Sequence, residues 1–152
     1  MSWWTAHAEQ TLNEEVPAGP DTVRGFYADL NNMKHVHPLV VAVRSTARNE
    51  GADGYAQSYR VRDRVPLGPF TIPTVYSARL SVPAAGGVTF QARQFPGVGL
   101  RGRVTFEPIE GGTRVTERLC IAAPRPLAGF TVREALKAHI AMLRGIRDYF
   151  AG

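Results

Sequence analysis

The stretch VTFEPIEGGTRVTERLCI, residues 104–121, decides the fold. Apolar and polar residues alternate on both sides of Glu110-Gly111-Gly112, a sequence typical of a tight turn between two strands. In a strand, every second side chain points to the same face. The stretch therefore predicts an antiparallel hairpin with one apolar face and one polar face.

The same alternation is found in the preceding part of the chain. It recurs around residues 55–62, 76–82, 88–93 and 100–107. A first strand is expected at Trp4–Leu12, and strand character resumes at Val40. Because the central segments share one apolar face, the pattern predicts a single antiparallel sheet of about seven strands that is covered on one side.

A helical pattern follows the first predicted strand. Val23, Phe26, Tyr27 and Leu30 have the spacing of an amphipathic helix of about three turns. A short second turn or helix is expected up to Val36, before the chain returns to extended geometry.

A longer apolar stripe predicts a C-terminal helix from about Leu127 to Phe150. Its start is open, because Pro126 suits a first helical turn and residues 131–134 also read as a capping box. At 1.5 Å per residue the helix would be roughly 36 Å long, enough to cross the sheet. The stripe consists of Val132, Leu136, His139, Leu143, Ile146 and Phe150.

These elements predict an α+β helix-grip fold. In this fold a curved antiparallel sheet wraps around a long C-terminal α-helix, and two short helices follow the first strand. No linker or internal repeat interrupts the sequence, so residues 1–152 are read as one domain.

Composition sets the class of protein. Hydrophobic residues make up 44% and charged residues 20% of the 152 residues, as in an ordinary globular domain. No apolar run is long enough for a transmembrane helix, and no signal peptide is recognised. The single cysteine, Cys120, excludes an internal disulfide and favours a cytoplasmic location.

Three segments resemble a known family. Residues 29–39 (DLNNMKHVHPL), residues 104–117 and residues 138–150 resemble the START/Bet v 1-like (SRPBCC) superfamily, in particular its polyketide cyclase/dehydrase-like branch. Met33 and Val36 stand where that family usually has tryptophans, which predicts repacking. The resemblance implies a cavity between sheet and long helix, and an apolar small-molecule ligand. It implies no particular chemistry, because the superfamily contains carriers, sensors and enzymes.

Turn composition predicts where a ligand enters. The turns at residues 50–54, 83–87 and 110–112 are short and polar or glycine-rich, whereas residues 65–73, 95–100 and 123–130 are apolar. Alternate turns of the sheet lie at opposite ends, so the apolar segments are expected to converge on the cavity mouth. A small satellite core is the alternative. The mouth residues would be Leu67, Phe70, Ile72, Phe95, Val98 and Phe130.

Two polar residues are candidates for chemistry. Glu117 falls between Val115 and Leu119 on the covered face, and a buried carboxylate must be paired, hydrogen-bonded or neutral. His139, on the inner stripe of the long helix, would form an acid/base pair with it. The structural alternatives are a bulge or a bond to a tyrosine for Glu117, and a satisfied core position for His139.

Aromatic and apolar side chains on the covered face are candidate ligand contacts. Tyrosine suits a cavity wall because its ring is apolar and its hydroxyl can orient an oxygenated ligand. Plain core packing is the alternative. The candidates are Tyr55, Gln57, Tyr59, Tyr76, Phe90, Phe106, Leu136 and Leu143.

The remaining motifs give weaker evidence about function. His35 and His37 have no third ligand nearby, so neither a metal nor a cofactor is expected. Cys120 is expected to face outward, without the surroundings of a nucleophile. The net charge is +5, and all but two of the 18 cationic residues are arginines. Arginines expected on the outer face are Arg60, Arg62, Arg79, Arg93, Arg101, Arg103, Arg114 and Arg118.

Three functions follow. The first is binding of a hydrophobic, partly oxygenated small molecule of lipid, polyketide or isoprenoid type. The second is a polyketide aromatase/cyclase or dehydratase that uses Glu117 and His139. The third is surface binding of an anionic membrane or of nucleic acid through the arginine face. Because that face has no aromatic stacking residues, no specific nucleic acid is expected. The oligomeric state is open between monomer and homodimer.

Overall fold

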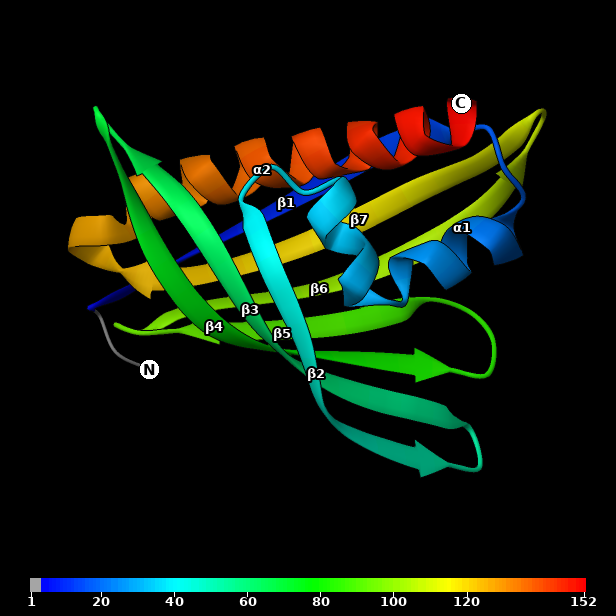
Figure 1. The fold of residues 1–152 in the computed structure, drawn as a ribbon, viewed down its shortest axis with the longest axis horizontal. Helices are drawn as coiled ribbons and strands as arrows, with labels where there is room; N and C mark the ends of the chain where they lie inside the picture. Colours follow the sequence, from blue (N-terminus) through cyan, green and yellow to red (C-terminus); the bar gives the residue numbers. More distant parts are fainter. Residues whose placement is uncertain (1–3) are drawn as a thin grey trace.

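The computed structural model describes residues 4–152 as one seven-stranded antiparallel sheet and three helical segments (Figure 1). The strand order is β1-β7-β6-β5-β4-β3-β2. The strands are β1 (Thr5–Val16), β2 (Val40–Gly51), β3 (Gly54–Leu67), β4 (Phe70–Pro83), β5 (Val88–Gln94), β6 (Val98–Ile109) and β7 (Gly112–Pro124). This is the predicted helix-grip architecture, although β1 continues four residues beyond the predicted end at Leu12.

Two short helical segments connect β1 to β2. The α-helix α1 (Pro20–Tyr27) ends three residues before the predicted Leu30. The reason is local: the Asp29 side chain accepts a hydrogen bond from the Asn31 amide and so caps a separate 3-10 helix, η1 (Leu30–His35). The two segments are the predicted short helices, with a break between them.

The long helix α2 (Arg125–Ala151) has Pro126 in its first turn. The earlier of the two predicted starts is therefore confirmed, and residues 131–134 lie inside the helix. In Figure 1, α2 (orange to red) runs along β1 and β7 on one face of the sheet, the two strands that it contacts most closely.

The period-two alternation is confirmed by burial. Val61, Leu80, Val104, Val115 and Leu119 face the helices and are buried. The eight arginines predicted to face outward are all exposed. The two short helical segments also lie on the inner face. Helix α1 packs against β6 and β7, and η1 packs against β2, so they cover part of the sheet that α2 leaves open.

The connections lie at two opposite ends of the sheet, as the alternation of turns requires. Figure 1 shows the β3–β4 and β5–β6 turns and the beginning of α2 at one end, on the left. The β2–β3, β4–β5 and β6–β7 turns lie at the other end. The three apolar segments identified in the sequence are therefore together in space.

Candidate functional site

A cavity of about 620 Å³ lies between α2 and the inner face of the sheet. Strands β3 to β6 form one wall, and η1 and α2 form the others. Most of the lining side chains are apolar. Four alanines, Ala78, Ala92, Ala135 and Ala138, line it, and their small side chains leave space that larger residues would fill.

The three apolar segments meet at this cavity. Leu67 and Ile72 line it from the β3–β4 hairpin, Phe95 and Val98 from the β5–β6 turn, and Phe130 from the first turns of α2. The Phe95 side chain is 93% exposed even though it borders the cavity. Of the predicted mouth residues, Phe70 lies outside the lining and is 71% exposed, because it sits at the tip of the hairpin.

Phe90 owes its place in the wall to a glycine. Gly102 on β6 is paired with Phe90 on β5, and a Cβ atom at Gly102 would overlap the Phe90 ring. The ring lies against that backbone, lines the cavity and stacks on the His139 ring at a centroid distance of 6.1 Å. Gly102 therefore determines how much of the cavity Phe90 occupies.

Glu117 is completely buried and fully paired. Its Oε1 lies 2.7 Å from His139 Nδ1, and its Oε2 accepts a hydrogen bond from the Tyr27 hydroxyl. The carboxylate thus joins β7 to both α1 and α2. Glu117 does not line the cavity. The structure contains both the predicted His139 pair and the tyrosine bond that was its structural alternative.

His139 does line the cavity. Burial lowers its pKa, but the Glu117 carboxylate and, more weakly, Asp63 outweigh burial and raise the pKa above its usual value. Protonated His139 donates from Nδ1 to Glu117, so Nε2 is the ring nitrogen left to contact a ligand. Burial, then the charge of Glu117 and the hydrogen bond to it, raise the pKa of Tyr27 well above its usual value.

His37 lies beside His139, with ring centroids 5.7 Å apart. Its Nδ1 accepts a hydrogen bond from the Leu39 amide. Burial, and then the charge of His139, lowers the pKa of His37 to about 3, so this ring is neutral. The close approach of Val36 to Gly145 on α2 holds the segment in place, since a Cβ on Gly145 would lie 2.9 Å from the Val36 carbonyl oxygen.

Asp63, Thr74 and Tyr76 form a third polar group on β3 and β4, and all three line the cavity. Burial raises the pKa of Asp63 to about 6 against the opposing effect of His139. Burial, and then the Asp63 charge, raises the pKa of Tyr76. Asp63 was not among the predicted site residues, although the inward period of Tyr59 and Val61 reaches it in one further step. Thr74 precedes Tyr76 in the inward period of β4 in the same way.

Only part of the predicted ligand contacts lines the cavity. Tyr76 and Phe90 do; the other six lie outside the lining. Alternation predicts which face of a strand a side chain lies on, but not where along the strand the cavity lies. Helices α1 and η1 cover the part of the inner face away from the β3–β4 and β5–β6 turns. Phe106, for example, packs edge-on against Tyr27 of α1 at 5.9 Å. The residues outside the lining are Tyr55, Gln57, Tyr59, Phe106, Leu136 and Leu143.

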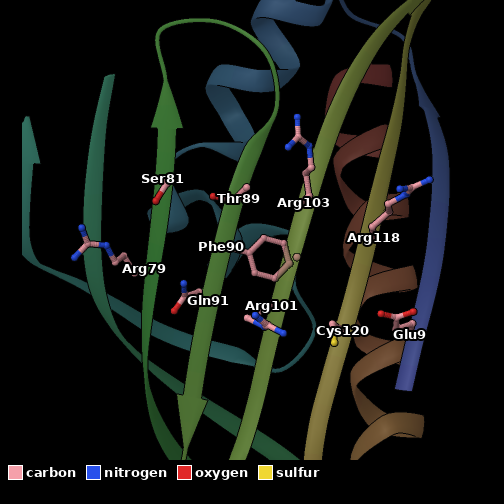
Figure 2. A pocket seen from close by; sticks show the side chains of 11 residues that line it. Glu9, Arg79, Ser81, Thr89, Phe90, Gln91, Arg101, Arg103, Arg118 and Cys120 are labelled. Carbon is pink, nitrogen blue, oxygen red and sulfur yellow. The ribbon is translucent and has the colours of Figure 1, made fainter. Parts of the chain in front are cut away.

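The outer face of the sheet has a groove of about 350 Å³ (Figure 2). Arg79, Arg101, Arg103 and Arg118 surround it, and Glu9 is the carboxylate in its lining. Figure 2 shows their side chains on the side of the sheet away from α2. Cys120 lies in the same groove on the outer face, as predicted.

Two other predictions concern membranes and metals. No helix in the described part of the chain is long and apolar enough to cross a bilayer. Within residues 4–152 no group of three or more potential metal ligands is found. His35 is exposed whereas His37 lines the cavity, so the two histidines of the predicted motif do not face the same way.

Solved structures with the same fold cover nearly the whole chain. A protein from Thermus thermophilus, TTHA0849, is 18% identical, with a TM-score of 0.66 over 93% of this chain and 95% of that chain. The Zhui aromatase/cyclase from Streptomyces sp. R1128 is 16% identical, with a TM-score of 0.69 over 97% and 94%. A STAR-related lipid transfer protein fragment from Xanthomonas axonopodis is 17% identical, with a TM-score of 0.61 over 95% and 86%. These likenesses show the fold.

Comparison with protein families identifies the family as well as the fold. No functionally curated protein matches the chain. A family model described as polyketide cyclase / dehydrase and lipid transport matches residues 6–148. That match spans all seven strands and nearly all of α2. The chain therefore belongs to the polyketide cyclase/dehydrase and lipid transport family.

Proposed function

We propose that this protein binds a hydrophobic, partly oxygenated small molecule in the cavity between the sheet and α2. The observation that carries the proposal is the cavity itself: about 620 Å³, apolar over most of its lining, with its polar groups restricted to a few side chains. This is the composition typical of small-molecule sites, where apolar walls supply affinity and a few polar atoms orient the ligand.

Binding is tested with the neutral dye Nile red, whose fluorescence rises in an apolar site, together with a thermal-shift measurement. A ligand that binds only the folded state raises the melting temperature by mass action. Ala135→Phe should fill the cavity and weaken Nile red binding about tenfold or more. Ala151→Phe is the matched control, since Ala151 is exposed near the end of the same helix. Absence of any bound dye, or equal affinity in Ala135→Phe, would contradict the proposal.

A second candidate function is acid/base catalysis on a polyketide-type substrate. It is supported by His139, which borders the cavity and whose pKa is raised by Glu117; when His139 is protonated, Nε2 would act as a proton donor to a bound carbonyl. The aromatase/cyclase with this fold makes the reaction class reasonable. Glu117→Gln separates the two functions through turnover. An enzyme loses its turnover of a polyketide-type substrate in this variant while it retains Nile red binding, whereas a carrier shows no turnover in either form and keeps its dye binding.

A third candidate is peripheral binding to anionic membranes through the outer groove. It is supported by the four arginines around that groove and by the direct cross-strand pairing of Arg103 with Arg118. Binding to vesicles with anionic headgroups should then fall steeply as salt rises. Arg103→Glu combined with Arg118→Glu should abolish it. Binding that is insensitive to salt and to these substitutions would exclude this candidate.

A further inference from the structure

Two buried oxygen atoms in the cavity wall have no hydrogen-bond partner in the protein. They are Asp63 Oδ1 and Thr74 Oγ1, and over residues 4–152 no other buried side-chain oxygen or nitrogen lacks one. Asp63 and Thr74 are directly opposite each other on β3 and β4, and both line the cavity. Asp63 is only 7% exposed. Because buried polar atoms are normally paired, a matched pair of exceptions in a cavity points to a ligand.

Other buried polar side chains of the sheet show the contrast. Gln57 donates to the Ala47 and Ser58 carbonyls, and Thr113 donates to the Ala18 carbonyl. Glu117 has a partner on each oxygen. Buried polar groups outside the cavity are therefore satisfied by the protein, while the pair that faces the cavity is not.

We propose that the ligand of this cavity is an apolar alcohol whose hydroxyl group lies between Asp63 and Thr74. The hydroxyl donates its proton to Asp63 Oδ1 and accepts a hydrogen bond from Thr74 Oγ1, so both unpaired atoms gain a partner. The inference rests on the proposed function, since it names the chemical class of the molecule that the cavity takes.

The charges around Asp63 disfavour an anion, and the hydrogen-bond donors and acceptors of the pair favour an alcohol over other polar ends. The described residues give Asp63 no ion pair, and His139 is paired with Glu117 at 2.7 Å. His37 is neutral, and the remaining charged side chains of the lining, Arg93 and Glu134, have opposite signs. A carboxylate placed beside Asp63 would be repelled. A ketone has no proton to donate to Asp63 Oδ1. An ammonium group could donate to both oxygens, but it would leave the Thr74 hydroxyl proton without an acceptor, whereas an alcohol oxygen accepts that proton and donates its own to Asp63.

The test compares decanol with decanoate, which have the same chain length and differ at the polar end. Affinities are measured by calorimetry or by displacement of Nile red, at neutral pH. The wild type should bind decanol at least about tenfold more tightly than decanoate, the size expected when a charged hydrogen bond is replaced by charge repulsion.

Two substitutions locate the preference. Asp63→Asn keeps the shape and removes the charge, so the preference for decanol should fall to about threefold or less. Thr74→Val removes only the hydroxyl group, which would donate to either ligand; it should weaken decanol and decanoate binding about threefold each and so leave the preference for decanol in place. Asp53→Asn is the matched control, because it removes the same charge from the exposed β2–β3 turn and should change neither affinity.

The outcomes separate this inference from the proposed function. Equal binding of decanol and decanoate by the wild type, or a preference unchanged by Asp63→Asn, overturns the alcohol site while Nile red binding upholds the cavity. If Nile red, decanol and decanoate all fail to bind, the proposed function and this inference both fall. If Asp63→Asn does not fold, the decanol preference of the wild type and the Thr74→Val result decide.

Discussion

Glu117 and Asp63 are buried carboxylates on the inner face of one sheet, in two regions that differ. Around Glu117 the interior is closed: Tyr27 and His139 occupy both carboxylate oxygens, and no part of Glu117 reaches the cavity. Around Asp63 the interior is hollow, and one oxygen is unpaired. The difference teaches that burial alone does not identify a functional acid. Whether the protein itself completes the hydrogen bonds of the group is the more informative property.

The largest effect is expected in the closed region. Glu117→Ala leaves the Tyr27 hydroxyl and His139 buried without their partner, and should lower the free energy of unfolding by about 3–5 kcal/mol. Chemical denaturation measures this loss. Glu107→Ala, which removes an exposed carboxylate on β6, is the control and should cost less than about 0.5 kcal/mol. A loss below about 1 kcal/mol for Glu117→Ala would mean that the pair does not hold the helices to the sheet.

The wall of the hollow region is tested by Gly102→Ala. The added Cβ overlaps the Phe90 ring and should push it into the cavity, which lowers the free energy of unfolding by about 1–3 kcal/mol and weakens Nile red binding. Gly99→Ala on the same strand is the control, because no atom lies within 4 Å of a Cβ built there. Unchanged dye affinity in Gly102→Ala would show that Phe90 does not limit the binding space.

Asp63→Asn should act in the opposite direction to Glu117→Ala. Burial raises the pKa of Asp63 from 3.8 to about 6, so the folded state holds this proton more tightly than the unfolded state. The wild type consequently loses stability as pH rises from about 4 to about 6, and asparagine does not. Asp63→Asn should therefore be more stable than wild type by roughly 2–3 kcal/mol at neutral pH and equal to it near about pH 4. A variant less stable than wild type at neutral pH contradicts an unpaired Asp63.

The smallest effect is expected on the outer face. Arg118 lies directly opposite Arg103, and like charges in a cross-strand pair repel. Arg118→Gln should raise the free energy of unfolding by about 0.5 kcal/mol at low salt, and the gain should disappear at high salt. Arg144→Gln, on the exposed side of α2, is the control. A gain that persists at high salt would have a cause other than charge repulsion.

The sequence was sufficient to predict which side chains share a face. The period of two in residues 104–121 fixes the sides of β6 and β7 because neighbouring strands must pair in register, and Glu117 was found as a polar residue out of place in that pattern. The pairing of Glu117 with His139 followed from the helical stripe of α2, which carries His139 towards the sheet.

The position of the cavity along the sheet was not predictable in the same way. Tyr59 and Phe106 have the correct face but lie where α1 and η1 cover the sheet, and no local pattern in β3 or β6 records that cover. On α2, Leu136 and Leu143 of the predicted stripe lie outside the cavity lining. The part of the helix that faces the cavity includes Ala135 and Ala138, whose small side chains leave space. Asp63 was missed because an aspartate between two arginines, Arg62 and Arg64, resembles an ordinary surface residue.

The central claim is that an apolar molecule enters the hollow beside Asp63 and not the closed region around Glu117. A methyl NMR titration with decanol tests it most directly. The account predicts that methyl signals of Val61, Ile72 and Ile121, which line the cavity, move on titration, while those of Val16, Val23 and Val115, buried elsewhere, do not. Shifts confined to the second set, or the absence of any shift at saturating decanol, would contradict it.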